Sequence, residues 1–277
     1  VTVFELEESP RARPQGGSLD IHEESGQAAL AEAGLLEGFR LLARFDDQAA
    51  CVYDRYGQLK LRDDSGSAGT RPEIDRSQLR ELLLGSLKPG TVRWGSRVKA
   101  VAQAQPGRWA VLGPEGALGE FDLVVGADGA WSRVRPALSS ALPRYCGVTF
   151  VELKLERVDS RFPELARLVA NGKTFAMGER KAVIAQRNSD SVVRVYVALT
   201  VPETWAGECL PASATGDQKR ATLLSQLQGW APALLAFIAN ADDFVLNNQE
   251  TARRYFGNVG QLREGWTADI ILVDYFP

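Results

Sequence analysis

The alternation of apolar and polar residues predicts a first region that mixes strands and helices. Residues 1–5 alternate as in a β-strand, and similar patterns predict strands at 97–103, 108–112 and 121–127. Turn residues at 54–57 lie between two further alternating runs and predict a β-hairpin. Helical patterns occur between these strands, so this region is expected to combine both kinds of structure.

Two short helices are expected near the start of this region. Ser25 is a suitable N-cap for a helix that runs to about Ala33, and Gly34 is a suitable stop signal. A second apolar face with helical spacing follows over residues 35–42.

The clearest helix lies in the stretch PEIDRSQLRELLLGSL. Asp75 and Gln78 have the spacing of a capping box, and Ile74 and Leu79 are placed to form a hydrophobic staple across the helix start. Four leucines make an apolar stripe, namely Leu79, Leu82, Leu83 and Leu87. Arg76 then occupies the first helical position, where a positive charge opposes the helix dipole. Such a local conflict is where a ligand is expected.

From residue 145 onward the pattern changes to long alternating runs. They are VTFVELKL, KTFAMG, KAVIAQR and VVRVYVALT, the last two joined by turn residues at 188–190. These runs predict an antiparallel sheet, and helical patterns follow near 217–228 and 232–239. The expected fold class is therefore α/β (α+β), with the antiparallel sheet as a second layer or domain.

Composition excludes several classes of function. The net charge of −3 is spread along the 277 residues, so the sequence gives no indication of nucleic-acid binding. No apolar window is long enough for a membrane helix, and no signal peptide is apparent, so a cytoplasmic, non-membrane protein is expected. Three scattered cysteines fit neither a disulfide framework nor a CxxC metal site. With His22 as the only histidine, a zinc centre or a Ser-His-Asp triad is not expected.

The stretch DLVVGADGAWSRVR is the first candidate for ligand chemistry. Asp128 follows the expected strand 121–127, and ligands bind at the carboxyl ends of strands in open α/β sheets. Its carboxylate would accept hydrogen bonds from ligand hydroxyls, and Ser132, Arg133 and Arg135 add donors for a phosphate or carboxylate. On these residues alone, the alternative that Gly-Ala-Asp-Gly is a turn and Asp128 caps the following helix has equal weight.

Glu5 is a second candidate, because it ends the first expected strand. An acid at the end of the second strand of a Rossmann half binds a ribose hydroxyl of a dinucleotide. Taken alone, Glu5 is explained better as a solvated carboxylate at a strand end. Its position gains meaning only together with the other motifs.

In combination, these motifs resemble one enzyme family. VxVxE, GGSLDIH, PEIDRSQLRELLL and DLVVGADGAWSRVR follow one another in the order found in the FAD-dependent class A aromatic hydroxylase-type monooxygenases. The stretch RARPQGGSLDIHEESGQAALAEAGLL is most similar to the tetracycline-inactivating branch. The resemblance covers roughly residues 1–240 and implies an incomplete Rossmann-like FAD-binding domain, followed by a substrate domain built on the antiparallel sheet.

The resemblance also implies roles for individual residues. Glu5 would bind the adenosine ribose of FAD, Arg76 its pyrophosphate or ribityl region, and Asp20 would lie near the flavin. Gly16 and Gly17 would give room for the cofactor, and Arg13 would assist NADPH. Asp128 and Gly129 belong to a motif that serves both FAD and NADPH in this family.

The chemistry implied by the resemblance is that of the flavin. NADPH reduces FAD, O2 adds to give a C4a-hydroperoxide, and one oxygen is transferred to an aromatic or polyketide substrate, including tetracycline-like molecules. The sheet at 145–200 would form the substrate wall, with Phe175, Met177, Arg187 and Arg194 as candidates. An ordinary alternating sheet face explains these four residues as well, and we prefer that explanation. We expect a monomer whose partners are small molecules.

Two motifs of the family are absent from the sequence. The chain contains no GxGxxG, and the strand, glycine loop and helix that carry it would have to precede Val1. The second flavin motif, a Gly-Asp followed by Ala-His and Pro, is missing as well. Without the glycine loop, FAD loses backbone donors for its pyrophosphate, so weak FAD binding is expected.

The sequence therefore predicts three parts. They are an FAD-binding domain at 1–143 without the GxGxxG unit, a substrate-binding sheet with helices at 144–246, and a tail at 247–277. The tail resembles the carboxyl-terminal segment of metal-dependent amidohydrolases, through Gly260, Leu262, Gly265, Ala268, Asp269 and Asp274. We expect it to be loosely docked; the alternative is that it fills the place of a missing strand. Besides a monooxygenase, a non-catalytic remnant stays open, whereas one histidine cannot supply an amidohydrolase metal cluster.

Overall fold

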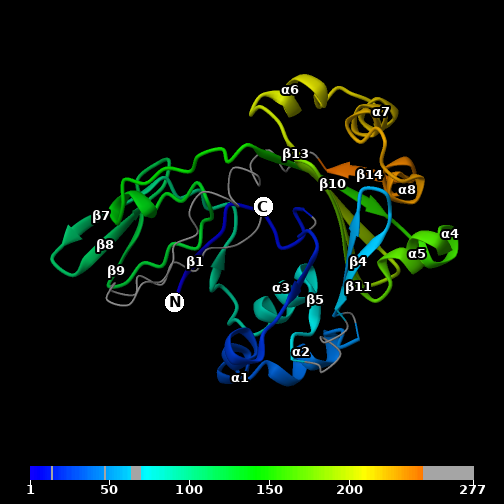
Figure 1. The fold of residues 1–277 in the computed structure, drawn as a ribbon. Coiled ribbons are helices and arrows are strands. Elements are labelled where there is room, and N and C mark those ends of the chain that lie inside the picture. The colour runs from blue at the N-terminus through cyan, green and yellow to red at the C-terminus, as the bar shows by residue number, and fades with distance from the viewer. Residues whose placement is uncertain (14, 47, 64–69, 246–277) are drawn as a thin grey trace. The chain divides into compact units, whose positions relative to one another are not determined.

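The computed structural model describes residues 1–13, 15–46, 48–63 and 70–245, which form two compact units. The first unit comprises residues 1–15 and 87–146, and the second comprises residues 16–86 and 147–245 (Figure 1). The predicted tail at 247–277 lies outside the described residues. Of the helices that are described, none has the length and apolar content that crossing a membrane requires.

The first unit is built from short strands. β1 (Val3–Phe4) pairs in parallel with β6 (Val92–Arg93). β1 lies within the strand predicted at residues 1–5. β7 (Ala100–Gln105), β8 (Arg108–Leu112) and β9 (Ala117–Phe121) form a three-stranded antiparallel sheet. The Phe4 and Phe121 rings meet edge to face with their centroids 5.9 Å apart, which packs β1 against the end of β9.

The predicted strand at 121–127 is wrong. β9 ends at Phe121, residues 123–127 have no regular structure, and the Leu123 and Val125 side chains are 78% and 48% exposed. An apolar run becomes a strand only where a neighbouring strand pairs with its backbone. Within the described part of the chain, no strand pairs with this run.

The second unit contains a seven-stranded sheet, which confirms the predicted antiparallel sheet. Its strand order is β14-β10-β13-β12-β11-β3-β4. The strands are β3 (Ala49–Asp54), β4 (Leu59–Asp63), β10 (Val148–Leu155), β11 (Gly172–Gly178), β12 (Lys181–Arg187), β13 (Val193–Thr200) and β14 (Asp243–Val245). Neighbours are antiparallel except β3 and β11, which are parallel. The predicted hairpin at 54–57 is confirmed, and its strands β3 and β4 lie beside β11 at one edge of this sheet (Figure 1).

One face of this sheet carries the main hydrophobic core. Alternate residues of β13 (Val193, Val195 and Val197) are fully buried there. The helices that pack on this face supply Leu165, Leu223, Leu234, Phe237 and Ile238. They are α5 (Pro163–Val169), α7 (Gly216–Gln226) and α8 (Pro232–Ala239); the short helices α4 (Val158–Arg161) and α6 (Trp205–Cys209) also contribute to this core. The opposite face is therefore left for polar and half-buried side chains.

A smaller core holds the remaining elements of the second unit. Its centre is Leu30, Phe39 and Ile74, with Leu79 and Leu82 packed against it. The elements are β2 (Ser18–Asp20), β5 (Glu73–Asp75), α1 (Ala28–Glu32), α2 (Leu36–Leu42) and α3 (Arg76–Gly85), and β2 pairs antiparallel with β5. The predicted staple between Ile74 and Leu79 agrees with this core.

Two local predictions for these helices need correction. Ser25 is not an N-cap, because it lies inside a π-helical turn at Glu23–Gln27 that leads directly into α1. Gly34 does end this helical stretch, with a φ of +71° that favours glycine. The predicted leucine stripe is only half correct, since Leu83 and Leu87 are 43% and 39% exposed.

Candidate functional site

The segment Gly16–Gly17 lies against the polar face of the seven-stranded sheet. A Cβ atom at Gly17 would lie 2.8 Å from the Tyr196 hydroxyl oxygen and 3.2 Å from Oε1 of Gln186. Gly17 is therefore required for close approach to β12 and β13 rather than for open space. Gly16 has a φ of +89°, and a Cβ atom there would be 3.5 Å from a guanidinium nitrogen of Arg76. The two glycines thus bring the backbone next to Arg76.

Arg76 begins α3, as predicted, and its backbone N–H donates to the carbonyl of Gly17 at 3.1 Å. The predicted capping box is wrong, because the Asp75 side chain makes no hydrogen bond to the start of α3. Its carboxylate instead accepts hydrogen bonds from Arg44 at 2.9 Å, from Asn188 Nδ2 at 3.1 Å and from the Ser189 N–H at 3.2 Å. These distant partners outcompete the local cap and fix α3 to the turn between β12 and β13.

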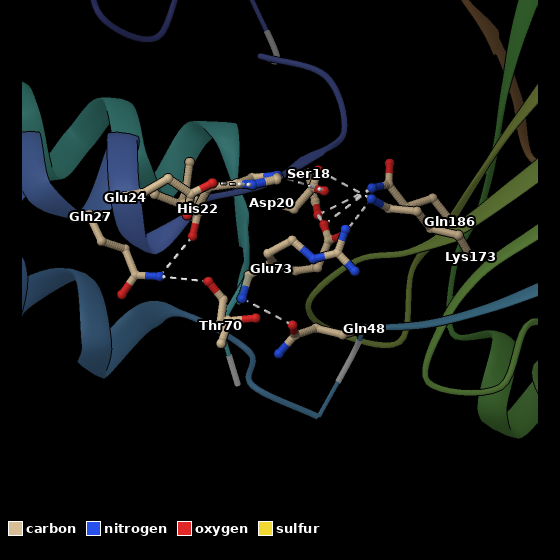
Figure 2. Close-up of polar contacts among 12 residues, drawn as sticks. Ser18, Asp20, His22, Glu24, Gln27, Gln48, Thr70, Glu73, Lys173 and Gln186 are labelled. Carbon is tan, nitrogen blue, oxygen red and sulfur yellow. Dashed lines mark hydrogen bonds and ion pairs between the residues drawn. The ribbon is translucent and has the colours of Figure 1, made fainter. Parts of the chain in front are cut away.

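A polar cluster of five residues lies next to this segment: Ser18, Asp20, Glu73, Lys173 and Gln186 (Figure 2). Glu73 is 2% exposed, and its carboxylate accepts hydrogen bonds from the Ser18 hydroxyl and from Gln186 Nε2, the latter at 3.2 Å. The Lys173 ammonium lies 2.7 Å from Oε1 of Glu73 and 3.2 Å from Oδ1 of Asp20. One lysine from β11 therefore joins two carboxylates from β5 and β2.

The charges in the cluster shift two pKa values. Burial raises the pKa of Asp20, but the charge and hydrogen bond of Lys173, with a backbone hydrogen bond, lower it by more, so the pKa is lowered overall. Burial alone would lower the pKa of Lys173, whereas Glu73 and Asp20 together raise it above its ordinary value. Both groups are therefore ionised at neutral pH. Oδ2 of Asp20 also lies 3.8 Å from Nε2 of His22.

Of the predicted site residues, the structure brings together the four in the second unit. They are Gly16, Gly17, Asp20 and Arg76. The sequence prediction missed Glu73, Lys173 and Gln186. In the sequence, Glu73 is an ordinary acid before Ile74. Lys173 and Gln186 occupy polar positions of alternating strands, so none of the three stands out. Only the pairing of β11 with β12, which places Lys173 opposite Gln186, shows that they belong to one cluster.

The predicted residues of the first unit bind their own neighbours. Oε1 of Glu5 accepts a hydrogen bond from the Glu7 N–H at 2.9 Å. Arg13 forms an ion pair with Glu7. These contacts span only a few residues, so in the structure both side chains are held by local turns.

The Asp128 carboxylate also closes a local turn. It accepts hydrogen bonds from the Ser132 hydroxyl at 2.6 Å and from the Arg133 N–H at 2.5 Å. The Arg135 guanidinium donates to the carbonyls of Ala130 and Gly129, at 2.6 Å and 3.3 Å. Gly129 has a φ of +75°, which the turn requires. Locally the structure shows the turn-forming alternative, although Asp128 caps a loop rather than a helix.

The candidates for the substrate wall divide into two pairs. Arg187 binds Asp159 through both terminal nitrogens, at 3.0 Å and 2.9 Å, and Arg194 forms an ion pair with Glu152. Both arginines therefore already have carboxylate partners. Phe175 is half-buried and Met177 is 53% exposed. Because alternate residues of a strand share a face, Phe175 and Met177 lie on the same sheet face as Lys173.

Outside this cluster, the described residues include a polar surface hollow but no candidate metal site. Among the residues that it describes, no group of three or more His, Cys, Asp and Glu side chains is placed to hold a metal ion. A polar surface hollow lies at the start of α7, away from the predicted site residues. It is lined by Thr215, Gly216, Asp217, Lys219, Arg220, Asp242, Asp243 and Phe244.

Two curated proteins are similar to this chain in sequence, although no protein-family model matches it. It is 36% identical over 209 residues to monooxygenase penA of Penicillium thymicola, which covers 72% of this chain and 48% of penA. It is 28% identical over 292 residues to monooxygenase asqM of Emericella nidulans, which covers 97% of this chain and 61% of asqM. The chain is therefore related in sequence to these monooxygenases, and its fold is that of the class A FAD-dependent monooxygenases. It spans about half the length of the curated relatives that it matches.

Solved structures of FAD monooxygenases share the fold. Klebsiella pneumoniae HpxO, complexed with FAD and uric acid, matches with a TM-score of 0.68 at 20% identity, over 88% of this chain and 60% of HpxO. The tetracycline destructase Tet(51) matches with a TM-score of 0.55 at 15% identity, over 88% of this chain and 61% of Tet(51). The predicted mixed α/β fold class with its antiparallel sheet is confirmed by these matches.

The residues around α3 suit the cofactor of this monooxygenase family. Gly16 has no side chain and lies beside the Arg76 guanidinium, so a ligand could contact the Gly16 backbone and the Arg76 cation together. Guanidinium groups bind phosphate oxygens with two parallel hydrogen bonds. The Asp20 carboxylate adds an ionised acceptor at the end of the same segment. This donor and acceptor set fits the pyrophosphate and hydroxyl groups of FAD.

Proposed function

We propose that this chain supplies the flavin-binding and substrate-facing residues of an NAD(P)H-dependent monooxygenase that hydroxylates an aromatic or polyketide substrate. The observation that carries the proposal is the contact of Gly16 and Gly17 with Arg76 at the start of α3, with Asp20 at the far end of the adjoining strand β2. These four residues come from two separate motifs that resemble the family, GGSLDIH and PEIDRSQLRELLL. The curated relatives, both named as monooxygenases, support the same reaction class.

In this proposal the second unit holds the flavin end of the cofactor. Arg76 binds the pyrophosphate or ribityl region through charge-assisted hydrogen bonds. Gly16 keeps a side chain out of the path of the cofactor, Gly17 lets this segment lie close to the sheet, and Asp20 accepts a hydrogen bond close to the flavin. When bound, FAD that has been reduced by NAD(P)H supplies the oxygen-transfer chemistry with O2.

The first unit contributes the remaining assigned residues. Glu5 binds the adenosine ribose, Arg13 assists NAD(P)H, and Asp128 with Gly129 contacts the dinucleotide. Asp128 accepts two hydrogen bonds from its own loop, so a ligand hydroxyl must share the carboxylate with Ser132 and Arg133. A carboxylate has about four acceptor positions, which leaves capacity for that contact.

The polar face of the sheet orients the substrate. On this face Phe175 lies directly opposite Ile184, which lies opposite Tyr196. This row of half-buried side chains offers a flat surface for an aromatic ring, and Met177 flanks it on β11. A tetracycline-like molecule is the narrower form of the proposed substrate class. It is supported by the stretch RARPQGGSLDIHEESGQAALAEAGLL.

Titration of the purified chain with FAD, followed by quenching of flavin fluorescence, tests the proposal. We expect weak but saturable binding, because the sequence contains no GxGxxG loop. Arg76→Ala is expected to weaken binding by about 1.5–3 kcal/mol, the range for a hydrogen bond to a charged group. Reduction of the bound flavin by NADPH, and oxygen uptake with aromatic substrates, then report turnover.

Arg40→Ala is the matched control. Arg40 lies on α2 of the same unit, is 51% exposed, and pairs with Glu37 one turn away. Its removal changes the net charge equally, so FAD affinity should stay at the value of the unsubstituted chain. Equal affinity of the Arg76→Ala variant would contradict the assignment of Arg76. Absence of any FAD binding would favour the alternative of a non-catalytic relative.

A further inference from the structure

The Glu73 carboxylate is a fixed buried charge that the flavin-binding residues do not include. It lies on β5, is 2% exposed, and accepts hydrogen bonds from Ser18 on β2 and Gln186 on β12. Both of its oxygens are occupied, because Oε1 receives the Lys173 ammonium at 2.7 Å. A carboxylate held by three elements cannot reorient without breaking several charge-assisted hydrogen bonds.

Lys173 links the buried Glu73 carboxylate to the carboxylate of Asp20. Its ammonium has three donors, and two of them point to Glu73 and Asp20 (Figure 2). Asp20 and Glu73 are direct cross-strand partners in the β2–β5 pair. Two carboxylates in that arrangement repel each other, and a cation between them removes the repulsion. Lys173 therefore holds the Asp20 carboxylate close to a second acid.

We infer that Lys173 is a positioning residue for the flavin-binding segment, acting through the Asp20 carboxylate, with Glu73 as its buried anchor. The inference rests on the proposed function, in which Asp20 lies close to the flavin. Lys173 itself touches neither cofactor nor substrate in this assignment. Its role is to keep one carboxylate ionised and in one rotamer beside the cofactor.

The backbone pairing shows why the lysine is not needed merely to dock β2. Ser18, Leu19 and Asp20 pair with Asp75, Ile74 and Glu73, so the backbone of Asp20 is already fixed. What this pairing leaves free is the side chain of Asp20, which is 41% exposed. A half-buried ion pair contributes little to stability compared with apolar residues of the same size. Its value here lies in the fixed direction of the carboxylate.

A double-mutant cycle in FAD affinity tests the inference. Lys173→Met is expected to weaken FAD binding about tenfold, within the range for coupled contacting residues. In an Asp20→Asn background the same substitution should change the affinity less than about twofold, because the group through which Lys173 acts is gone. Lys173→Arg, which keeps the charge, should restore most of the affinity. A purely structural role would weaken binding equally in both backgrounds and would overturn the inference.

Two further variants guard against misfolding and nonspecific charge effects. Glu73→Gln combined with Lys173→Met leaves no buried unpaired charge, and it should show the same loss of FAD affinity as Lys173→Met. Lys154→Met is the matched control, because Lys154 lies on β10 of the same sheet and pairs with an exposed acid, Glu156, at 2.7 Å. It should bind FAD normally. Absence of FAD binding by the unsubstituted chain overturns the proposed function and the inference together, whereas binding that Lys173→Met leaves unchanged overturns the inference alone.

Discussion

The two units hold their candidate ligand-binding residues in opposite ways. In the second unit, Asp20 and Glu73 are bound by Lys173, which lies 153 and 100 positions away along the chain. In the first unit, Asp128 and Glu5 are bound by residues no more than five positions away. The first kind of contact exists only once the whole unit has folded, and the second kind forms within a loop.

This difference has a consequence for how each unit meets a ligand. Long-range contacts fix a side chain relative to several elements, so the cluster around Asp20 is organised before any cofactor binds. A local turn fixes the side chain only relative to its own loop. The residues of the first unit can therefore exchange an internal hydrogen bond for one to a ligand at small cost to the fold.

The largest expected effect is the loss of the buried anchor. Glu73→Ala removes the acceptor of Lys173, Ser18 and Gln186 and leaves a half-buried ammonium with only Asp20. We expect the free energy of unfolding to fall by about 3–5 kcal/mol, the cost of breaking a buried pair from one side. Urea denaturation measures this change. Glu164→Ala serves as the control, since that acid is 83% exposed and its loss should change the free energy by less than about 1 kcal/mol.

A smaller effect is expected where Gly17 meets the sheet. Gly17→Ala places a methyl group 2.8 Å from the Tyr196 hydroxyl oxygen, so the unfolding free energy should fall by about 1–3 kcal/mol through overpacking. Tyr196→Phe removes that oxygen. The doubly substituted chain should therefore be more stable than the sum of the two single effects predicts. Strict additivity in thermal or urea unfolding would show that the contact is not tight.

The matching test in the first unit is Asp128→Ala. The loss of two hydrogen bonds within an exposed loop should lower the unfolding free energy by no more than about 1.5 kcal/mol. If Asp128 also contacts the dinucleotide, as proposed, FAD affinity and the rate of flavin reduction by NADPH should both fall. A large loss of stability would contradict the contrast between the two units. If FAD affinity and the rate of flavin reduction are both unchanged, Asp128 acts only in closing its turn.

The smallest effect is a dependence of stability on pH. Burial raises the pKa of Asp20, but Lys173 and hydrogen bonds lower it by more, so its pKa is lower in the folded chain than in the unfolded chain. Such a group stabilises the fold above its unfolded pKa of about 3.9, and this contribution is lost as the pH falls through the folded pKa. The difference in Tm between the unsubstituted chain and Asp20→Asn should therefore shrink as the pH falls below about 4. A constant difference would contradict this coupling.

Local patterns were enough for some elements of the fold. The alternating runs predicted β10 to β13, and the position of Arg76 at the first residue of α3 followed from PEIDRSQ. Alternation reveals which residues share a face, but it carries no information on which strand lies next to which. The parallel pairing of β3 with β11 is therefore invisible in the sequence. So is the contact of Lys173 with Glu73.

The wrong local predictions have a common cause. Asp75 has the sequence spacing of a capping residue, yet Arg44 and Asn188 bind its carboxylate. Residues 121–127 have the apolar content of a buried strand, yet no described strand pairs with residues 123–127. In both cases the sequence shows what a segment prefers, and tertiary partners decide whether that preference is met.

The parallel pairing of β3 with β11 also constrains the order in which the chain folds. The hairpin β3–β4 is synthesised early, but its partner strand follows only after the whole 87–146 segment of the first unit. Until β11 emerges, one edge of this hairpin is unpaired and prone to associate with other chains. Closing so long a loop also slows folding. Early folding of residues 87–146, which would shorten the distance between the two strands, is thus expected to protect the nascent chain from aggregation.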